Sequence, residues 1–148
     1  GGVSVGEKDL LPGVIENLTG NVLFHGIQVK PGMPTMLSVV KGTPVLSLSG
    51  NPFAVEALFE VLAGGYLTDM EASRYLQKNQ MKILKQTFVK TGKMKRIVKG
   101  RCDESGVYLP QIQKNGQLKN GIGSNCLVIF PEGERTYAEG EAVRVIRI

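Results

Sequence analysis

The stretch PVLSLSGNPFAVEALFEVL, residues 44–62, changes character at a Gly-Asn-Pro corner. Its first five residues are apolar enough to predict a strand. Gly50 then permits a sharp turn without a Cβ penalty. Asn51 can cap a helix, and Pro52 can occupy the first helical position. We therefore expect a strand, a corner and a helix that continues to about Leu67.

This helix is expected to be buried around most of its circumference, with Glu56 and Glu60 sharing its one polar stripe. The corner before it would place free backbone N–H groups of a helix beside the carboxyl end of a strand. Anions bind at that position in open α/β sheets. Gly, Asn and Pro are also common in purely structural turns, so the corner alone leaves both interpretations open.

Two other turns favour a binding site. GGVSVGEKD, residues 1–9, is a glycine-rich turn before an apolar segment at helical spacing, 9–18, in which Asp9 is a candidate N-cap. VKPGMP, residues 29–34, sets Lys30 in a rigid loop after another apolar strand. The strands expected in this half are 22–29, 36–40 and 44–48. Three such turns that meet in space would form one site.

The composition changes after Tyr66, and from Lys78 the chain has the pattern of short strands separated by glycine turns. The strands expected there are 81–89, 94–102, 107–112, 126–130 and 142–148. This spacing is typical of a small sandwich or barrel. The predicted fold class is α/β plus all-β: a partial α/β domain over residues 1–77, with a parallel or mixed sheet and helices, and a small β-barrel domain over residues 78–148.

The composition is that of a soluble globular chain, with 42% hydrophobic and 21% charged residues. Cys102 and Cys126 belong to no Cys-x-x-Cys or Cys/His cluster, which argues against zinc and favours buried free thiols in a reducing compartment. No apolar run approaches the ~20 residues of a membrane-spanning helix, and no signal-peptide pattern opens the chain. We expect a cytoplasmic protein with no membrane partner. Because no strand precedes the first glycines, we also expect an amino-terminal part before Gly1.

Ten basic residues and no acidic one lie between Ala72 and Arg101, and they hold much of the net charge of +5. A nucleic-acid module would carry such a stripe. Only Tyr75 and Phe88 lie within the stripe as stacking platforms, however, and no aromatic RNA-binding motif occurs. We therefore favour a solvated protein face that helps attract an anionic ligand, and regard nucleic acid as an unlikely partner.

Taken together, the motifs resemble the molybdopterin molybdenumtransferases, the family that includes the animal protein gephyrin. The resemblance runs through GGVSVGEKDLL, VLFHGIQVKPGMPTM and LSLSGNPFAVEALF, in the family's order and spacing. It continues through GKMKRIVKG, NCLVIFPEG and AEGEAVRVIRI, so it covers essentially the whole chain but only the second half of a family member. The family implies a molybdopterin-binding α/β domain followed by a small β-barrel.

The family's reaction inserts molybdenum from molybdate into adenylylated molybdopterin and releases AMP, with magnesium taking part. The resemblance makes Asp9 and Lys30 the expected catalytic residues, and Asp9 the expected magnesium ligand. It also implies a homodimer and makes a molybdopterin adenylyltransferase a candidate partner. The expected cofactor-binding residues are Gly1, Gly2, Ser4, Gly6, Lys30, Pro31, Gly32, Ser49, Gly50, Asn51 and Pro52. The 148-residue chain alone is expected to be inactive.

The sequence departs from the family's pattern at three places. Ser49 stands where the family has the first proline of Pro-Gly-Asn-Pro, and Met33 stands where many members carry a second lysine. Lys119 and Asn120 replace serines that bacterial members often have in a loop facing the active site. These departures keep a second hypothesis open, a pterin-binding or scaffolding module without catalysis.

Taken singly, several of these residues also have simple structural explanations. Asp9 can be only an N-cap, and Lys30 only a solvated loop charge. His25 has no second ligand at metal spacing, so a packed or edge-strand histidine is expected. Ser4 and Ser49 have no recognisable base partner and are not expected to be nucleophiles.

Overall fold

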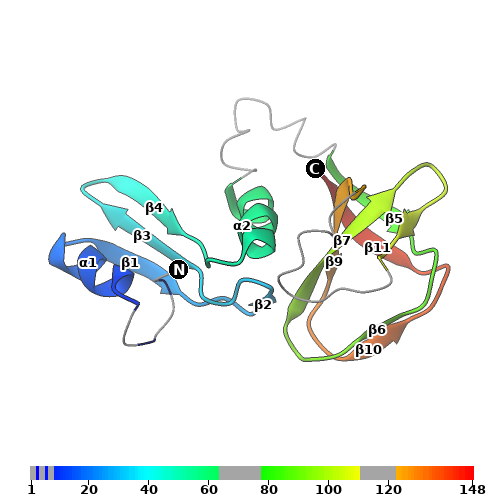
Figure 1. Ribbon diagram of the computed structural model, residues 1–148, viewed down its shortest axis with the longest axis horizontal. Coiled ribbons are helices and arrows are strands. Elements are labelled where there is room, and N and C mark those ends of the chain that lie inside the picture. Colours follow the sequence, from blue (N-terminus) through cyan, green and yellow to red (C-terminus); the bar gives the residue numbers. More distant parts are fainter. Residues whose placement is uncertain (1–2, 4–5, 7–8, 64–77, 111–122) are drawn as a thin grey trace.

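The computed structural model describes residues 3, 6, 9–63, 78–110 and 123–148. In the first half, helix α1 (Leu11–Asn17) is followed by a three-stranded sheet in the order β1-β3-β4 (Figure 1). The strands are β1 (Asn21–His25), β3 (Met36–Val40) and β4 (Thr43–Ser47). Pro44 lies on β4, which is an edge strand of this sheet, where a missing N–H costs no ladder bond.

The three-stranded sheet itself is antiparallel in both pairings and not parallel or mixed as expected. The link between β3 and β4 explains this. Lys41 and Gly42 both have positive φ, 49° and 81°, as a two-residue hairpin turn requires. Parallel neighbours would need a crossover of a dozen or more residues. The parallel pairing of this half is that of Val29–Lys30 with Lys95 and Arg96, in a mixed sheet.

Helix α1 begins differently from the sequence prediction. Its N-cap is Leu10, with no side-chain cap, so Asp9 is not the N-cap. The Asp9 carboxylate instead accepts the Gly6 N–H at 3.1 Å, and the Asp9 N–H donates to the Gly6 carbonyl at 2.9 Å. Asp9 therefore closes a turn within the glycine-rich segment and does not cap the start of the helix.

Helix α2 (Pro52–Leu58) has the predicted start. Asn51 is its N-cap, with Oδ1 accepting the Ala54 N–H at 3.1 Å, and Pro52 opens the first turn. A π-helical turn, Phe59–Ala63, continues it, and the expected end at Leu67 lies outside the described residues.

The burial predicted for this helix is wrong. Only one face is buried, through Ala54, Ala57 and Leu58, whereas Val55 and Phe59 remain 39% and 45% exposed. Glu56 and Glu60 do not form a purely solvated stripe, because they pair with basic residues of the second half: Glu56 with Lys99, and Glu60 with Lys78 at 3.5 Å. The helix thus turns its small residues and its carboxylates toward the rest of the molecule.

The second half is built from seven described strands and from one strand of the first half, β2 (Val29–Lys30). The main sheet has the order β2-β7-β9-β11-β5, with β8 paired to β7, while β10 and β6 pair separately. The seven strands are β5 (Asn79–Ile83), β6 (Phe88–Lys90), β7 (Lys95–Cys102), β8 (Val107–Tyr108), β9 (Cys126–Phe130), β10 (Arg135–Tyr137) and β11 (Ala142–Arg147). The sheet is mixed, because β2 runs parallel to β7 and the other pairings along it are antiparallel.

No closed barrel forms among the described strands, so that expectation is not confirmed. The β6–β10 pair packs on the main sheet through aromatic rings. The Phe130 centroid lies 4.5 Å from that of Phe88 and 4.7 Å from that of Tyr137. These rings belong to one buried cluster with Val98, Val128 and Val145, which forms the core of the second half.

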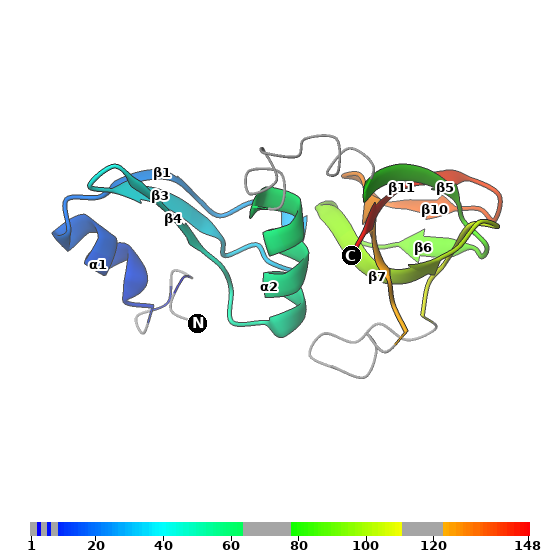
Figure 2. The same cartoon turned by 90° about the horizontal axis from the view of Figure 1, so that it is seen from above.

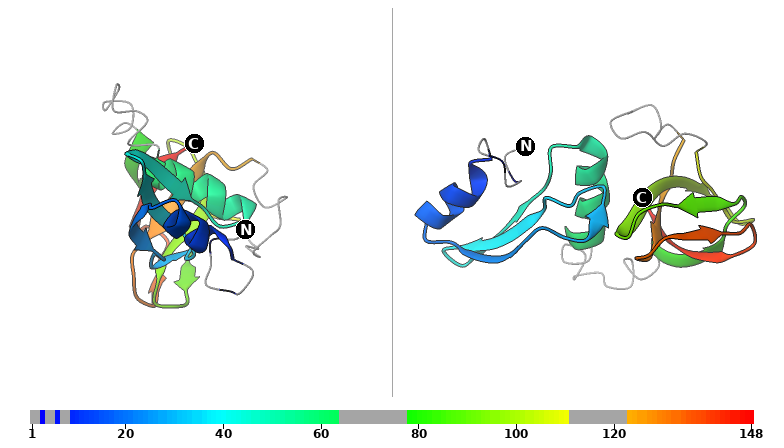
Figure 3. Two further views of the ribbon diagram at one scale, coloured as in Figure 1. Left: turned by 90° about the vertical axis from the view of Figure 1, so that its left-hand side faces the viewer. Right: turned by 90° about the horizontal axis from the view of Figure 1, so that it is seen from below.

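Helix α2 stands between the two sheets (Figures 2 and 3). A single apolar cluster joins Ala57 and Leu58 of this helix to Ile97 of β7 and Ile129 of β9. The two halves of the chain therefore share a core, and the parallel β2–β7 pairing joins them a second time. The division into domains 1–77 and 78–148 stays a prediction.

Cys102 and Cys126 are buried and unbridged, which confirms the prediction of free thiols. Within the described parts of the chain, no helix has the length and hydropathy needed to span a bilayer.

Candidate functional site

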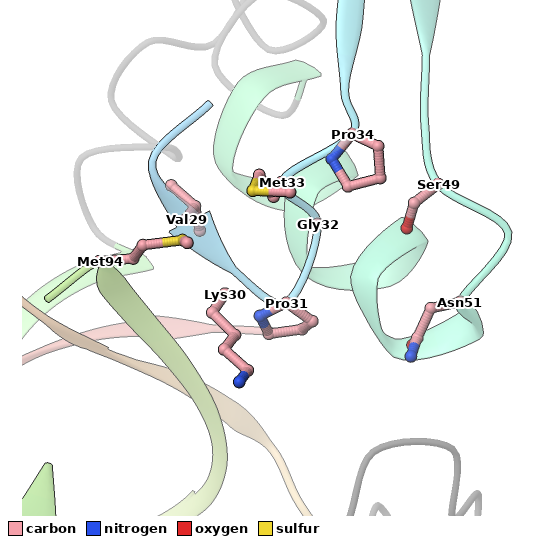
Figure 4. Close-up of a pocket in the computed structure, with 9 residues that line it drawn as sticks. All are labelled: Val29, Lys30, Pro31, Gly32, Met33, Pro34, Ser49, Asn51 and Met94. Atoms are coloured by element: carbon pink, nitrogen blue, oxygen red, sulfur yellow. The ribbon is translucent and has the colours of Figure 1, made fainter. Parts of the chain in front are cut away.

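A cavity of about 430 Å³ lies where β2, the start of α2 and the segment before β7 come together (Figure 4). Its lining residues are Val29, Lys30, Pro31, Gly32, Met33, Pro34, Ser49, Asn51 and Met94. Two of the three turns singled out in the sequence, VKPGMP and the SGNP corner, therefore face one another across a single pocket. These turns are separated by two strands in the chain, so their convergence is a property of the fold.

The Lys-Pro-Gly loop is held in place by Gly32. This residue has φ of +111°, which L side chains rarely adopt, and a Cβ there would lie 2.2 Å from Leu58 Cδ1 of α2. The Gly32 carbonyl accepts the hydroxyl of buried Thr35 at 2.7 Å. Glycine thus lets the loop pack directly on α2, which fixes Lys30 and Pro31 at the wall of the pocket.

The opposite wall is the corner before α2. The Asn51 side chain occupies one backbone N–H of the first helical turn, that of Ala54, and so holds the corner to the helix. Ser49, which precedes this corner, also lines the pocket. Figure 4 shows the Lys30 and Asn51 side chains projecting in the same direction from the two walls.

The third contribution, Met94, was missed by the sequence analysis. It lies just before β7, in the second half of the chain, and reaches the pocket because β2 pairs with β7. The sequence signal nearby is the Thr91-Gly92 turn, which separates two strands and carries no information about a partner more than sixty residues earlier.

The chemistry of the lining is simple. Most of the surface is apolar, from the side chains of Val29, Met33 and Met94 and from the prolines, and Lys30 is the charged group among the nine lining residues. Ser49 and Asn51 add a hydroxyl and an amide. Such a lining suits a flat, largely uncharged ring system that carries an anionic group. Among these nine residues there is no carboxylate or histidine that could act as a general base.

Comparison with known proteins finds molybdopterin molybdenumtransferases that match nearly the whole chain. The molybdopterin molybdenumtransferase of Staphylococcus aureus (strain COL) is 28% identical over 151 residues, covering 99% of this chain and 36% of the relative. The corresponding protein of Staphylococcus epidermidis (strain ATCC 12228) is 26% identical over the same length. Residues 1–69 also match a family profile described as a probable molybdopterin binding domain.

Solved structures agree. The molybdopterin biosynthesis moeA protein from Pyrococcus horikoshii OT3 superposes with a TM-score of 0.71 at 25% identity, over 86% of this chain and 33% of that chain. A second crystal structure of a Pyrococcus moeA protein gives a TM-score of 0.75 at 29% identity, over 94% and 34%. The chain is similar to molybdopterin molybdenumtransferases over 99% of its length. It spans about a third of the length of the curated relatives it matches.

The structure brings together at one pocket some of the site residues that the resemblance to the molybdenumtransferases implied. Lys30, Pro31, Gly32, Ser49 and Asn51 line the pocket. Gly50 and Pro52 adjoin lining residues without being among them. Gly1, Gly2 and Ser4 lie outside the described residues, as do Lys119 and Asn120.

Gly6 and Asp9 do not line the pocket but form the turn described above. The glycine-rich segment contacts the three-stranded sheet through Val3. His25 on β1 donates from Nε2 to the Val3 carbonyl, and buried Val3 packs with Ile15 and Met36. Of the two predicted places for His25, packed or on an edge strand, the described sheet has the second, and the partner of His25 is a carbonyl of the glycine-rich segment.

A magnesium site made by the protein is not found in the described part of the chain, where no three His, Cys, Asp or Glu side chains group closely enough to hold a metal ion. Asp9 is a single carboxylate, and one of its two oxygens, Oδ2, already accepts the Gly6 N–H. Magnesium keeps several waters and needs about six oxygens, so Asp9 alone does not fit it.

Proposed function

We propose that this chain works in molybdenum cofactor biosynthesis, as the part of a molybdopterin molybdenumtransferase that binds adenylylated molybdopterin in the pocket between Lys30 and Asn51. The enzyme would insert molybdenum from molybdate into this substrate and release AMP. The observation that carries the proposal is the meeting of the Lys-Pro-Gly loop and the Gly-Asn-Pro corner at one pocket. The match to molybdenumtransferases over 99% of the chain supports it.

In this proposal each wall of the pocket has a task. The apolar side chains of Val29, Met33 and Met94 contact the pterin, and the Lys30 ammonium holds a phosphate oxygen. When the bond between the two phosphates breaks, negative charge grows on the released AMP and on the remaining phosphate. A fixed positive charge at the wall lowers the energy of that state without having to reorganise.

The finer expectations from the family stay predictions. They are the magnesium ion on Asp9, the homodimer, the molybdopterin adenylyltransferase partner, the closed barrel and the cytoplasmic location. The magnesium ligands would have to come mostly from the substrate and water, because Asp9 alone does not fit such a site.

The test is AMP release from adenylylated molybdopterin with molybdate, measured on the protein expressed from its complete gene. We expect molybdate-dependent AMP release that falls at least about tenfold in the Lys30→Gln variant, because a charge-assisted bond to phosphate is lost. The control is Lys41→Gln, which removes the same charge from the β3–β4 turn, away from the pocket. Absence of molybdate-dependent AMP release would refute the enzymatic proposal.

Met33 favours a second candidate, a pterin-binding module without catalysis. It is 49% exposed and lines the pocket where many relatives are expected to have a lysine, so this chain has less positive charge there. Binding of adenylylated molybdopterin without AMP release would identify this candidate.

Nucleic-acid binding loses support from the structure. Lys78 and Lys99 of the basic segment pair with carboxylates on α2, and Lys90 is buried. From residue 78 on, where the structure describes this segment, the basic residues therefore do not form one continuous exposed stripe.

A further inference from the structure

Lys30 lies directly beside a second cation. It is on β2, and its register partner on the neighbouring parallel strand β7 is Arg96. Residues in register on adjacent strands project from the same face of a sheet, with their Cβ atoms ~5 Å apart. The preceding pair, Val29 and Lys95, projects from the opposite face.

No carboxylate is in register with Arg96 on either neighbouring strand. On its other side its register partner is Phe130 of β9, which is fully buried, and two residues along β7 lies Val98, which is buried as well. The nearest acidic position along the ladder is the exposed Glu132, opposite Met94, because the Gly133 N–H donates to the Lys93 carbonyl. In the described part of the chain, neither Lys30 nor Arg96 makes a side-chain hydrogen bond or an ion pair. Like charges directly opposite each other on a sheet destabilise it, and among the described residues no ion pair to Lys30 or Arg96 offsets that cost.

The pair lies at the edge of the pocket, with Lys30 among the lining residues and Arg96 next to it on β7. Met94, two residues before Arg96, lines the cavity too. Arg96 is half-buried, which limits its freedom, whereas Lys30 is exposed. Figure 4 shows the Lys30 side chain beside the start of β7. An oxyanion seated at this wall would meet both cations and remove their repulsion.

We propose that Arg96 and Lys30 form a two-cation clamp that binds a phosphate group of the pocket's ligand, so that the second half of the chain supplies one half of the phosphate site. Arg96 offers a planar fork of donors that matches two phosphate oxygens, and Lys30 offers a point charge. That the ligand is adenylylated molybdopterin rests on the proposed function. The clamp itself rests on the β2–β7 register.

The test compares Arg96→Gln with Arg96→Lys and with Lys95→Gln. The last variant removes the same charge one residue away, from the opposite face of β7, and so controls for the general field of the molecule. Dissociation constants are measured for inorganic phosphate and for adenylylated molybdopterin, with circular dichroism confirming that each variant is folded. We expect Arg96→Gln to weaken both ligands about tenfold, Arg96→Lys to weaken them less, and Lys95→Gln to change them by less than about twofold.

The outcomes separate this clamp from the proposed function. Equal effects of Arg96→Gln and Lys95→Gln would overturn the clamp even if adenylylated molybdopterin binds well. Arg96-dependent binding of inorganic phosphate without any binding of adenylylated molybdopterin would support the clamp and refute the proposed function. Failure to bind either ligand would overturn both.

Discussion

At the scale of single residues, Gly32 determines the shape of the pocket. Its positive φ and its contact with Leu58 are both incompatible with a side chain. We predict that Gly32→Ala lowers the free energy of unfolding by about 2–4 kcal/mol, the sum of backbone strain and overpacking. Urea unfolding of the purified variant measures this loss.

Gly42 is the matched control for Gly32. It also has positive φ, at 81°, but a Cβ there meets nothing within 4 Å. Gly42→Ala should therefore cost only about 1 kcal/mol, from the backbone alone. Equal losses at the two positions would show that the contact with α2 does not constrain the Lys-Pro-Gly loop.

The sequence predicted residue roles well where the cause is local. Asn51 and Pro52 start α2 as expected, because capping and a fixed φ depend only on the neighbouring backbone. Asp9 was expected to cap a helix and instead closes a turn with Gly6. In a helix cap and in this turn alike, the carboxylate accepts a nearby backbone N–H, so the sequence does not distinguish the two. Met94 could not be predicted, because its place in the pocket depends on a pairing between distant strands.

At the scale of elements, Lys90 fixes the turn between β6 and β7. Its side chain is 2% exposed, and its ammonium donates to the carbonyls of Gly92, at 2.8 Å, and of Gly133. We predict that Lys90→Met lowers the free energy of unfolding by about 2–4 kcal/mol, because two carbonyls lose their buried donor. Chemical denaturation measures this.

Lys93, in the same turn, is the control for Lys90 because its side chain is exposed. Lys93→Met should change stability by no more than about 0.5 kcal/mol. If Lys90→Met is equally mild, the buried ammonium does not hold the turn.

The start of strand β9 gives a prediction about pH. Burial, with a smaller contribution from the neighbouring Cys102, raises the pKa of the Cys126 thiol from 9.0 to about 12. Between these two values the unfolded chain releases a proton that the folded chain keeps, so stability falls as pH rises, by up to ~1.4 kcal/mol per pH unit. Below pH 9 this group has no effect on stability.

The measurement for Cys126 is the slope of unfolding free energy between pH 9 and 10.5, compared with Cys126→Ala. The comparison removes the contribution of lysines that titrate in the same range. A shallower slope is expected for the variant. Identical slopes would mean that the thiol is not protected from ionisation in the folded protein.

Helices and strands, too, were predicted well from the sequence where their causes are local and poorly where they depend on distant residues. The strand Met36–Val40 has the predicted limits. A loop with Pro and Gly precedes it, and a turn of a lysine and a glycine with positive φ follows it, so both ends have local causes. The burial of α2 was predicted wrongly, since an apolar residue such as Phe59 does not reveal whether a partner covers it. The parallel β2–β7 pair joins residues too distant for any pattern to connect.

At the scale of the whole molecule, the shared core predicts that the two halves unfold together. Ile97 on β7 packs in the cluster that contains Ala57 and Leu58 of α2. Ile97→Ala should cost about 2–4 kcal/mol and should lower the amide-exchange protection of α2 together with that of β9. Native-state hydrogen exchange measures both elements in one experiment.

The control for Ile97 is Ile83→Ala, which truncates an isoleucine that is 42% exposed on β5. It should change protection little in either half. If Ile97→Ala weakens β9 and leaves α2 unchanged, the halves behave as independent domains, as the division at residues 77 and 78 predicts.

The central claim is that the pocket between Lys30 and Asn51 binds adenylylated molybdopterin. Calorimetric titration of the 148-residue chain with this compound tests it most directly. We predict saturable binding that weakens about tenfold in Lys30→Gln and stays unchanged in Lys41→Gln. No binding, or equal weakening by both substitutions, would contradict it.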